Sequence, residues 1–191
     1  MKLSDSLSLL SRYGIPTSGK PVVLSEALEL PRPLVLKADT EGHKTEEGMV
    51  FLGLKDDEEV KAAYGKISKK YGVFAQPVVK GFEFAAGAVD DPCFGKVVMF
   101  GLGGVYAELF RDVSFRATPL TERDAREMVD ELQSSRLFRE FRGKKLSRSA
   151  VVDVLLKLSR LCESVDFKEI DINPLMVDTR RALAVDARVI L

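Results

Sequence analysis

The second half of the chain alternates short apolar runs with turn-forming residues, and this pattern constrains the fold most strongly. Residues 82–89 and 96–100 are expected to be strands, and Asp-Asp-Pro at 90–92 is a turn signal between them. Residues 175–189 predict a second hairpin, with its turn at 178–181. Strands joined by such short turns are antiparallel. The chain is therefore expected to have an α+β fold and not a doubly wound parallel sheet.

Four segments have the apolar periodicity of amphipathic helices. The first covers residues 3–13. The second is capped by Asp56 and is expected to stop near Gly72. The third opens at Thr121, with acidic residues in its first turn, and the fourth covers residues 147–162. Helices and hairpins together account for most of the chain.

Size and charge exclude several classes of protein. A chain of 191 residues, 46% of them apolar, makes one domain or two small lobes that share a core. The net charge is zero, so no binding to nucleic acid or to an acidic membrane is expected. The N-terminus lacks the apolar core of a signal peptide, and no run approaches the roughly 20 apolar residues of a membrane helix. Two cysteines without CxxC spacing fit a reducing cytoplasm.

Lys37 and His43 are candidate residues for phosphoryl chemistry. Lys37 ends an apolar strand, where an ammonium group can meet phosphate oxygens in a cleft. His43, the only histidine, lies in a polar loop, and a neutral imidazole nitrogen is a competent phosphoryl acceptor. Each has a simpler interpretation, because a strand-end lysine can reach water and a loop histidine can be merely solvated.

Oxygen-bearing side chains near the end of the chain predict a magnesium site. Asn173 and Asp186 come from neighbouring strand-like segments, and Asp171 shares a strand face with Asn173 because the two are two residues apart. Mg²⁺ is commonly held by one or two carboxylates together with nucleotide phosphates. Asn-Pro at 173–174 also fits a strand that simply enters a turn, but that interpretation leaves the second acidic residue, Asp186, unexplained.

Two weaker signals lie in the middle of the chain. The glycine-rich residues 101–104 could let backbone amides approach phosphate, or could form a loop that needs positive φ angles. Arg116 could stabilise phosphate charge, or could belong to a solvated strand face. Considered jointly, a lysine, magnesium ligands and one imidazole are the groups needed to move a phosphoryl group between a nucleotide and a histidine.

These segments together resemble the β subunit of ADP-forming acyl-CoA (acetyl-CoA) synthetases, which are ATP-grasp domains related to the nucleotide-binding part of succinyl-CoA synthetase. The resemblance runs along nearly the whole chain, and its strings are at residues 13–16, 35–37, 43–45, 76–81, 91–95, 99–104, 112–116, 119–125, 171–175 and 185–188. It implies a single ATP-grasp domain over residues 1–191, with mixed and antiparallel sheets holding nucleotide between two lobes. The small nucleotide-covering lobe would span about 15–76 and the large metal-binding lobe about 77–191.

The resemblance also implies a role for each matching position. Lys37 is similar to the lysine that contacts nucleotide phosphates, and His43 to a histidine that takes a phosphoryl group in transit. Asn173 and Asp186 match the pair that binds Mg²⁺, and Asp171 matches the acidic residue near the phosphohistidine. Further residues match the nucleotide-binding positions: Gln76, Pro77 and Val78 as the hinge whose backbone reads adenine, and Glu83 as a ribose-binding or nucleotide-facing carboxylate.

The implied reaction is acyl-CoA + ADP + phosphate = carboxylate + CoA + ATP, with Mg²⁺ and ATP or ADP bound to this chain. A CoA-binding α subunit with a second phosphohistidine is the implied partner, in an α2β2 heterotetramer. One departure concerns the loop after His43, where Glu46 and Glu47 stand in place of the usual glycines. Two alternatives therefore remain: a standalone ATP-grasp carboxylate ligase that does not need His43, and a non-catalytic subunit with a degenerate nucleotide site.

Overall fold

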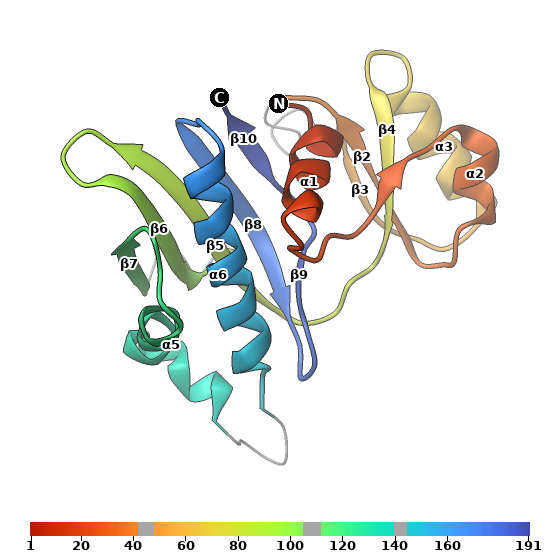
Figure 1. Cartoon of the computed structure of the whole chain (residues 1–191). Coiled ribbons are helices and arrows are strands. Elements are labelled where there is room, and N and C mark those ends of the chain that lie inside the picture. Colours follow the sequence, from red (N-terminus) through yellow and green to blue (C-terminus); the bar gives the residue numbers. More distant parts are fainter. Residues whose placement is uncertain (42–47, 105–111, 140–144) are drawn as a thin grey trace. The chain divides into compact units, whose positions relative to one another are not determined.

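The computed structural model describes residues 1–41, 48–104, 112–139 and 145–191 (Figure 1). These residues form two compact units. The first contains Met1–Ser6 and Ser18–Val79, and the second contains Leu7–Thr17 and Lys80–Leu191. Residues 15–17, expected in the small lobe, belong to the second unit, and residues 77–79 belong to the first. Over the described ranges, no helix is both long and apolar enough to cross a membrane.

The first unit is built on a sheet with strand order β1-β4-β2-β3. Its described strands are all antiparallel to their neighbours. The bounds are Lys20–Pro21 for β1, Leu34–Asp39 for β2, Val50–Leu54 for β3 and Gly72–Pro77 for β4. Helices α2 (Leu24–Glu29) and α3 (Asp57–Ile67) pack on one face of this sheet.

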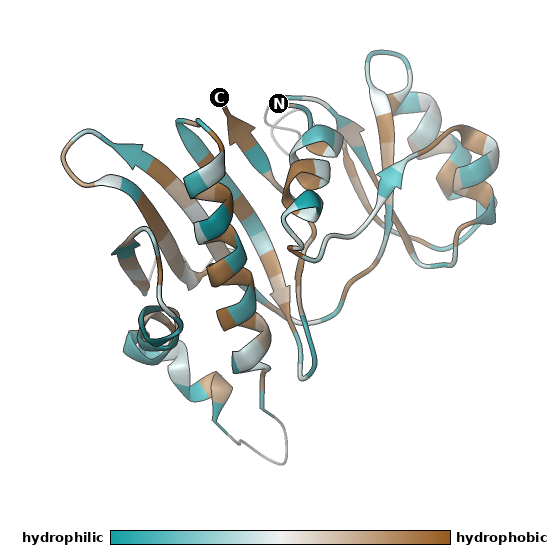
Figure 2. Ribbon diagram, in the orientation of Figure 1, coloured by the Kyte–Doolittle hydropathy of each residue, from teal (hydrophilic) through white to brown (hydrophobic). Residues whose placement is uncertain are grey.

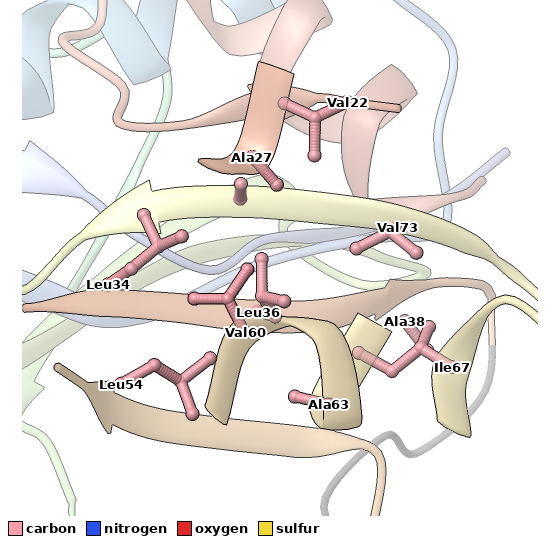
Figure 3. Packing of buried hydrophobic residues seen from close by; sticks show 11 residues of the cluster. Val22, Ala27, Leu34, Leu36, Ala38, Leu54, Val60, Ala63, Ile67 and Val73 are labelled. Carbon is pink, nitrogen blue, oxygen red and sulfur yellow. The ribbon is translucent and has the colours of Figure 1, made fainter. Parts of the chain in front are cut away.

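Apolar side chains from the sheet and from both helices form the core of the first unit (Figure 3). Leu34, Leu36 and Ala38 alternate along β2 and are fully buried in this cluster. Val60 and Ile67 of α3 pack against them. Because neighbouring residues of a strand point to opposite faces, the residues between these on β2 face away from the helices.

Helix α3 begins as its sequence predicts and ends earlier than expected. The Asp56 carboxylate accepts a hydrogen bond from the Glu59 N–H (2.9 Å), which confirms the predicted cap. The expected end near residue 72 is wrong, because the helix stops at Ile67. The Ser68 N–H still bonds to the Tyr64 carbonyl (2.8 Å), and a turn of three further residues leads into β4.

The second unit contains a sheet with strand order β10-β8-β5-β6-β7, and β9 also pairs with β8. These strands are antiparallel to their neighbours. The bounds are Phe82–Asp91 for β5, Gly95–Leu102 for β6, Val113–Ala117 for β7, Glu169–Val177 for β8, Ala182–Ala184 for β9 and Arg188–Ile190 for β10. The α+β class and both predicted hairpins are confirmed, and the second turn lies at 178–181 as expected. The first turn lies at 92–94 and not at 90–92, because Asp90 and Asp91 belong to β5.

Helices cover one face of this second sheet (Figure 1). Helix α5 (Glu122–Glu131) packs on β6 and β7, and α6 (Arg148–Ser164) packs on β5 and β6. Thr121 and Ser147 accept hydrogen bonds from the first turns of α5 and α6, at the predicted starts of both helices. Figure 2 shows brown apolar residues alternating with polar ones along α6, as expected for a helix with one buried face.

Two sequence-based expectations about the last strands are wrong. Residues 173–174 do not enter a turn but lie within β8, where the pairing with β5 shifts register. The strand expected over 182–189 is interrupted, because residues 185–187 separate β9 from β10. Both short strands therefore pair with the same edge of β8, one after the other.

Candidate functional site

The interruption between β9 and β10 places Asp186 opposite Asn173. Leu175 pairs with Ala184 on one side of the interruption, and Asp171 pairs with Arg188 on the other. The register is the same on both sides, so Asp186 is the residue that faces Asn173 across the interrupted stretch. The structure thus brings the two predicted magnesium ligands together, on neighbouring segments of one sheet edge.

Asp171 lies beside Asn173 and Asp186, and the carboxylates here (Asp171, Asp186 and Glu169) are called the acidic cluster. Asp171 faces the side of the sheet that α5 and α6 leave uncovered. Ile170 and Ile172 are fully buried on the helix-covered face, so Asp171 and Asn173 point to the other face. Burial raises the pKa of the Asp171 carboxyl, and the charges of Glu169 and Asp186 raise it further. The acidic cluster therefore favours the arrival of positive charge.

Arg188 and Glu169 complete the neighbourhood of Asp171, and neither was singled out from the sequence. Arg188 lies directly across from Asp171 on β10 and lowers the pKa of its carboxyl, against the larger effects that raise it. Glu169 lies two residues before Asp171 on the same strand face. That spacing of two, already used for Asn173, is the signal that could have identified Glu169.

Glu83 lies beside the glycine-rich segment that follows β6. The Gly103 N–H donates a hydrogen bond to the Glu83 carbonyl (3.0 Å). Gly104 has a φ of +62°, and a Cβ built on it would collide with the Glu83 carboxylate. The glycine at 104 is therefore favoured by its backbone conformation, and any larger residue there would displace the Glu83 carboxylate. Glu83 pairs with Met176 of β8 and points to the same uncovered face as Asp171.

Arg116 lies on the opposite face of the sheet from Asp171. It pairs with the fully buried Val98 of β6, and its guanidinium binds the Glu131 carboxylate of α5 through both terminal nitrogens. The bond to Glu131 raises the pKa of Arg116, and the same bond lowers the pKa of Glu131. The structure thus does not bring Arg116 together with the magnesium pair, and its nucleotide-binding role stays a prediction.

Lys37 and Gln76 share one face of the sheet of the first unit. Val35 pairs with Gln76 and Lys37 pairs with Phe74, so all four point away from α2 and α3. Lys37 is 6% exposed and Gln76 is 4% exposed. The Gln76 Oε1 atom is buried and has no hydrogen-bond partner among the residues that the structure describes. A buried acceptor without a donor is costly, so this face provides an acceptor for a donating ligand.

The remaining hinge residues offer little backbone capacity for donation. Pro77 has no N–H group, and the Val78 N–H is already bonded to the Pro33 carbonyl (3.2 Å). If this segment binds a nucleotide base, its backbone carbonyl oxygens and the Gln76 side chain are the groups left to form hydrogen bonds with that base. His43, Glu46 and Glu47 lie outside the described residues, so their predicted roles stay predictions.

The acidic cluster can be tested for its fit to Mg²⁺. Across the described ranges, no group of three or more His, Cys, Asp or Glu side chains could hold a metal ion by itself. One amide oxygen from Asn173 and one carboxylate from Asp186 suit Mg²⁺ when nucleotide phosphates and water supply the other ligands. The donor set therefore fits a magnesium ion that arrives with a nucleotide.

Comparisons with known proteins define the class to which this fold and site belong. A family model described as an ATP-grasp domain matches residues 1–191, and the chain belongs to this family. Its homologues include β subunits of ADP-forming acetate–CoA ligases. The chain is 36% identical to "Acetate--CoA ligase [ADP-forming] II subunit beta" of Pyrococcus furiosus, over 98% of this chain and 89% of that one. The predicted ATP-grasp fold is confirmed.

A longer relative and a solved structure extend the comparison. "Acetate--CoA ligase [ADP-forming] II" of Archaeoglobus fulgidus is 39% identical over 98% of this chain, which spans only 30% of that protein. The acetyl-coenzyme A synthetase 1 of Ca. Korarchaeum cryptofilum has a TM-score of 0.86 and 37% identity, over 99% of this chain and 91% of that one. That structure contains coenzyme A and Mg-AMPPCP, with a phosphohistidine segment pointing towards the nucleotide binding site.

Proposed function

We propose that this chain is the nucleotide-binding β subunit of an ADP-forming acyl-CoA synthetase. It would exchange a phosphoryl group between a histidine and ADP or ATP during acyl-CoA + ADP + phosphate = carboxylate + CoA + ATP. Its partner would be a CoA-binding α subunit with its own phosphohistidine, in an α2β2 assembly. The observation that carries the proposal is the position of Asn173 opposite Asp186, with Asp171 beside them.

In this proposal Asn173 and Asp186 hold Mg²⁺ through their side-chain oxygens. When bound there, the metal would neutralise charge on the nucleotide phosphates. Burial is the main cause of the raised pKa of Asp171, and the charges of Glu169 and Asp186 raise it further; a cation would relieve this second, electrostatic part. Asp186 contributes directly to that repulsion, which supports its proximity to Asp171.

Lys37 and Gln76 are proposed to bind the nucleotide itself. The Lys37 ammonium group would neutralise phosphate oxygens, as a compact point charge does well. The unpartnered Gln76 Oε1 would accept a hydrogen bond from an amino group of the base. Glu83, on the uncovered face of the second sheet, would accept hydrogen bonds from the ribose hydroxyls.

His43 is proposed to carry the phosphoryl group in transit. In the direction of ATP formation, an oxygen of the ADP β-phosphate attacks the phosphorus of phospho-His43. The new P–O bond forms while the P–N bond breaks, and its electron pair returns to the imidazole nitrogen. Asp171 would orient the imidazole by accepting a hydrogen bond from its other nitrogen. Catalysis of this kind rests mainly on positioning and charge stabilisation.

Phosphate transfer from γ-labelled ATP tests this proposal. The chain and its His43→Ala variant are incubated with labelled ATP and Mg²⁺, first alone and then with a candidate α subunit. We expect an acid-labile, base-stable label on the wild type that the variant lacks. Asp153→Asn on the exposed surface of α6 is the control and should be labelled normally.

Two other outcomes would replace the proposal. Binding of Mg-ATP without any label, together with ADP release driven by an amine or thiol, would indicate a standalone carboxylate ligase. Absence of both label and Mg-ATP binding with the partner present would indicate a non-catalytic subunit. Near-normal ATP synthesis by His43→Ala with the α subunit would contradict the relay through His43.

A further inference from the structure

A cavity of about 720 Å³ lies within the second unit, away from the candidate functional site. Its walls come from the start of β5, the residues before α6 and the turn between β8 and β9. Phe82, Leu137, Leu146 and Val177 provide its apolar lining. Phe82 is 52% exposed, so its ring is available to contact a ligand in the cavity.

The cavity opens on the helix-covered face of the sheet. Phe82 pairs with Val177, and the next pair on the same face is Phe84 with Leu175. The Phe84 ring contacts the ring of Phe138 (centroids 5.2 Å apart), which belongs to the 3-10 helix η1 (Gln133–Phe138). Glu83, between the two phenylalanines, points to the other face. The sheet therefore separates the cavity from Glu83 and from the acidic cluster around Asp171.

Backbone contacts hold the walls of the cavity together. The Ser147 N–H donates to the Asp178 carbonyl (2.9 Å), and the Leu146 N–H donates to the Leu137 carbonyl (3.0 Å). A Cβ on Gly81 would lie 2.8 Å from the Val177 carbonyl oxygen, so glycine permits the residue before β5 to approach the end of β8 this closely. A cavity whose walls are tied in this way is preformed, as most small-molecule sites are.

The rim of the cavity carries an excess of positive charge. Lys80, Lys145 and Arg180 line it, and none of the three forms an ion pair with a carboxylate in the described part of the chain. The one acidic lining residue, Asp178, accepts hydrogen bonds from the Arg180 and Arg181 N–H groups and pairs with the Arg181 side chain (3.2 Å). These bonds, led by that from the Arg180 N–H, lower the pKa of Asp178 and engage its charge locally.

We infer that this cavity binds an organic anion that combines an apolar body with a carboxylate or phosphate group. The apolar lining formed by Phe82, Leu137, Leu146 and Val177 would bury the body, and the three cations of the rim would bind the anionic group. A bare inorganic anion would leave the apolar lining without a contact. This inference concerns a second ligand site and does not depend on the proposed nucleotide chemistry.

Three probes with one ring system test the inference by calorimetry on the full chain. They are 1-naphthyl phosphate, 1-naphthoate and the neutral 1-naphthalenemethanol, each titrated with and without saturating Mg-ADP. We expect both anions to bind once per chain, about 10-fold or more tightly than the neutral alcohol. The ratio between the two anions tells whether the rim prefers phosphate or carboxylate.

Variants locate the binding. The double variant Lys80→Ala, Arg180→Ala should lower the affinity for both anions about 10-fold and leave the affinity for the neutral probe unchanged. Phe82→Ser should lower the affinity for all three probes. Arg123→Ala, which removes an exposed cation of α5, is the matched control and should change nothing. Equal affinity for the neutral and anionic probes, unchanged binding to the double variant, or complete displacement by Mg-ADP would each overturn the inference.

Discussion

Asp171 on β8 lies directly opposite Arg188 on β10, and yet the pKa of the Asp171 carboxyl is raised. The cation lowers this pKa, but burial and the neighbouring carboxylates of Glu169 and Asp186 raise it more. Water screens the charge of the exposed Arg188, whereas the half-buried Asp171 carboxylate loses part of its hydration. Ionisation of the Asp171 carboxyl is therefore less favourable in the folded protein than in a free carboxyl, in spite of the neighbouring Arg188.

Asp171→Asn should raise the free energy of unfolding at neutral pH. A raised pKa means that the folded state holds its proton to higher pH than the unfolded state. Stability from this carboxyl is therefore full below the ordinary pKa of 3.8 and is lost as the pH rises through the folded value. The asparagine variant avoids that loss, so it should exceed the wild type near pH 7 and match it near pH 3.5.

Urea unfolding at a series of pH values between 3.5 and 7.5 checks this prediction. Asp153→Asn, which removes a surface carboxylate from α6, is the control and should change stability by less than about 0.5 kcal/mol. If Asp171→Asn were equally or less stable than the wild type at pH 7, the claim that the ionised Asp171 carboxyl destabilises the folded protein would be disproved. The same variant should lose phosphoryl transfer, because stability and function are opposed at this position.

Asp186→Asn should weaken magnesium binding without unfolding the protein. The substitution keeps the shape of the side chain but removes the negative charge, and a hard divalent cation requires that charge. We expect the Mg²⁺ concentration for half-maximal nucleotide binding to rise about 10-fold or more. Titration of Mg²⁺ at fixed ADP measures it, and Asp130→Asn on α5 is the control. An unchanged Mg²⁺ requirement would remove Asp186 from the metal site.

Gly104→Ala should impair nucleotide binding through Glu83. The new methyl group would meet the Glu83 carboxylate, and the positive φ of residue 104 adds backbone strain of about 1 kcal/mol. Gly95→Ala is a matched control, because Gly95 has a φ of +70° and nothing within 4 Å of the added Cβ. Both variants should lose similar stability in thermal unfolding, but only Gly104→Ala should raise the KM for Mg-ADP. Equal KM values for the two would exclude a role for Glu83.

Arg116→Ala should lower stability and leave nucleotide binding unchanged. Its guanidinium ties β7 to α5 through Glu131, on the sheet face opposite Asp171. A double-mutant cycle with Glu131→Gln should give a coupling energy of about 0.5–1 kcal/mol. The coupling should fade as the pH falls through the lowered pKa of Glu131, because protonation removes its charge. A large rise in the KM for Mg-ADP with unchanged stability would instead favour phosphate contact by Arg116.

Local signals predicted the beginnings of helices and the hairpins well. Asp56, Thr121 and Ser147 each cap a helix, because a short oxygen-bearing side chain before an apolar periodic segment has few other uses. The end of α3 was missed by about one turn, since residues 68–72 contain no strong terminator until Gly72. The alternative interpretation of Asn173 and Pro174 as a turn is wrong, and only the pairing with β5 shows that the strand continues through them.

The face of the sheet to which each side chain points could not be predicted from local signals. Arg116 and Asp171 both belong to strands, but which of them shares a face with the metal pair depends on register between strands far apart in sequence. The burial of Gln76 and its unpartnered oxygen likewise follow from how four strands and two helices pack. The proximity of Asn173 and Asp186 could be predicted from the sequence, because a short hairpin joins the segments that carry them.

The position of Asp186 opposite Asn173 depends on the length of the three-residue segment that interrupts β9 and β10. Residues 185–187 bridge two strands that are each anchored to β8 at fixed positions, Ala184 at Leu175 and Arg188 at Asp171. Inserting or deleting one residue here would leave every side chain of the acidic cluster chemically intact and still separate Asp186 from Asn173 or reverse the facing of β10. The predicted metal site therefore depends on the length of this segment as much as on the identities of its side chains.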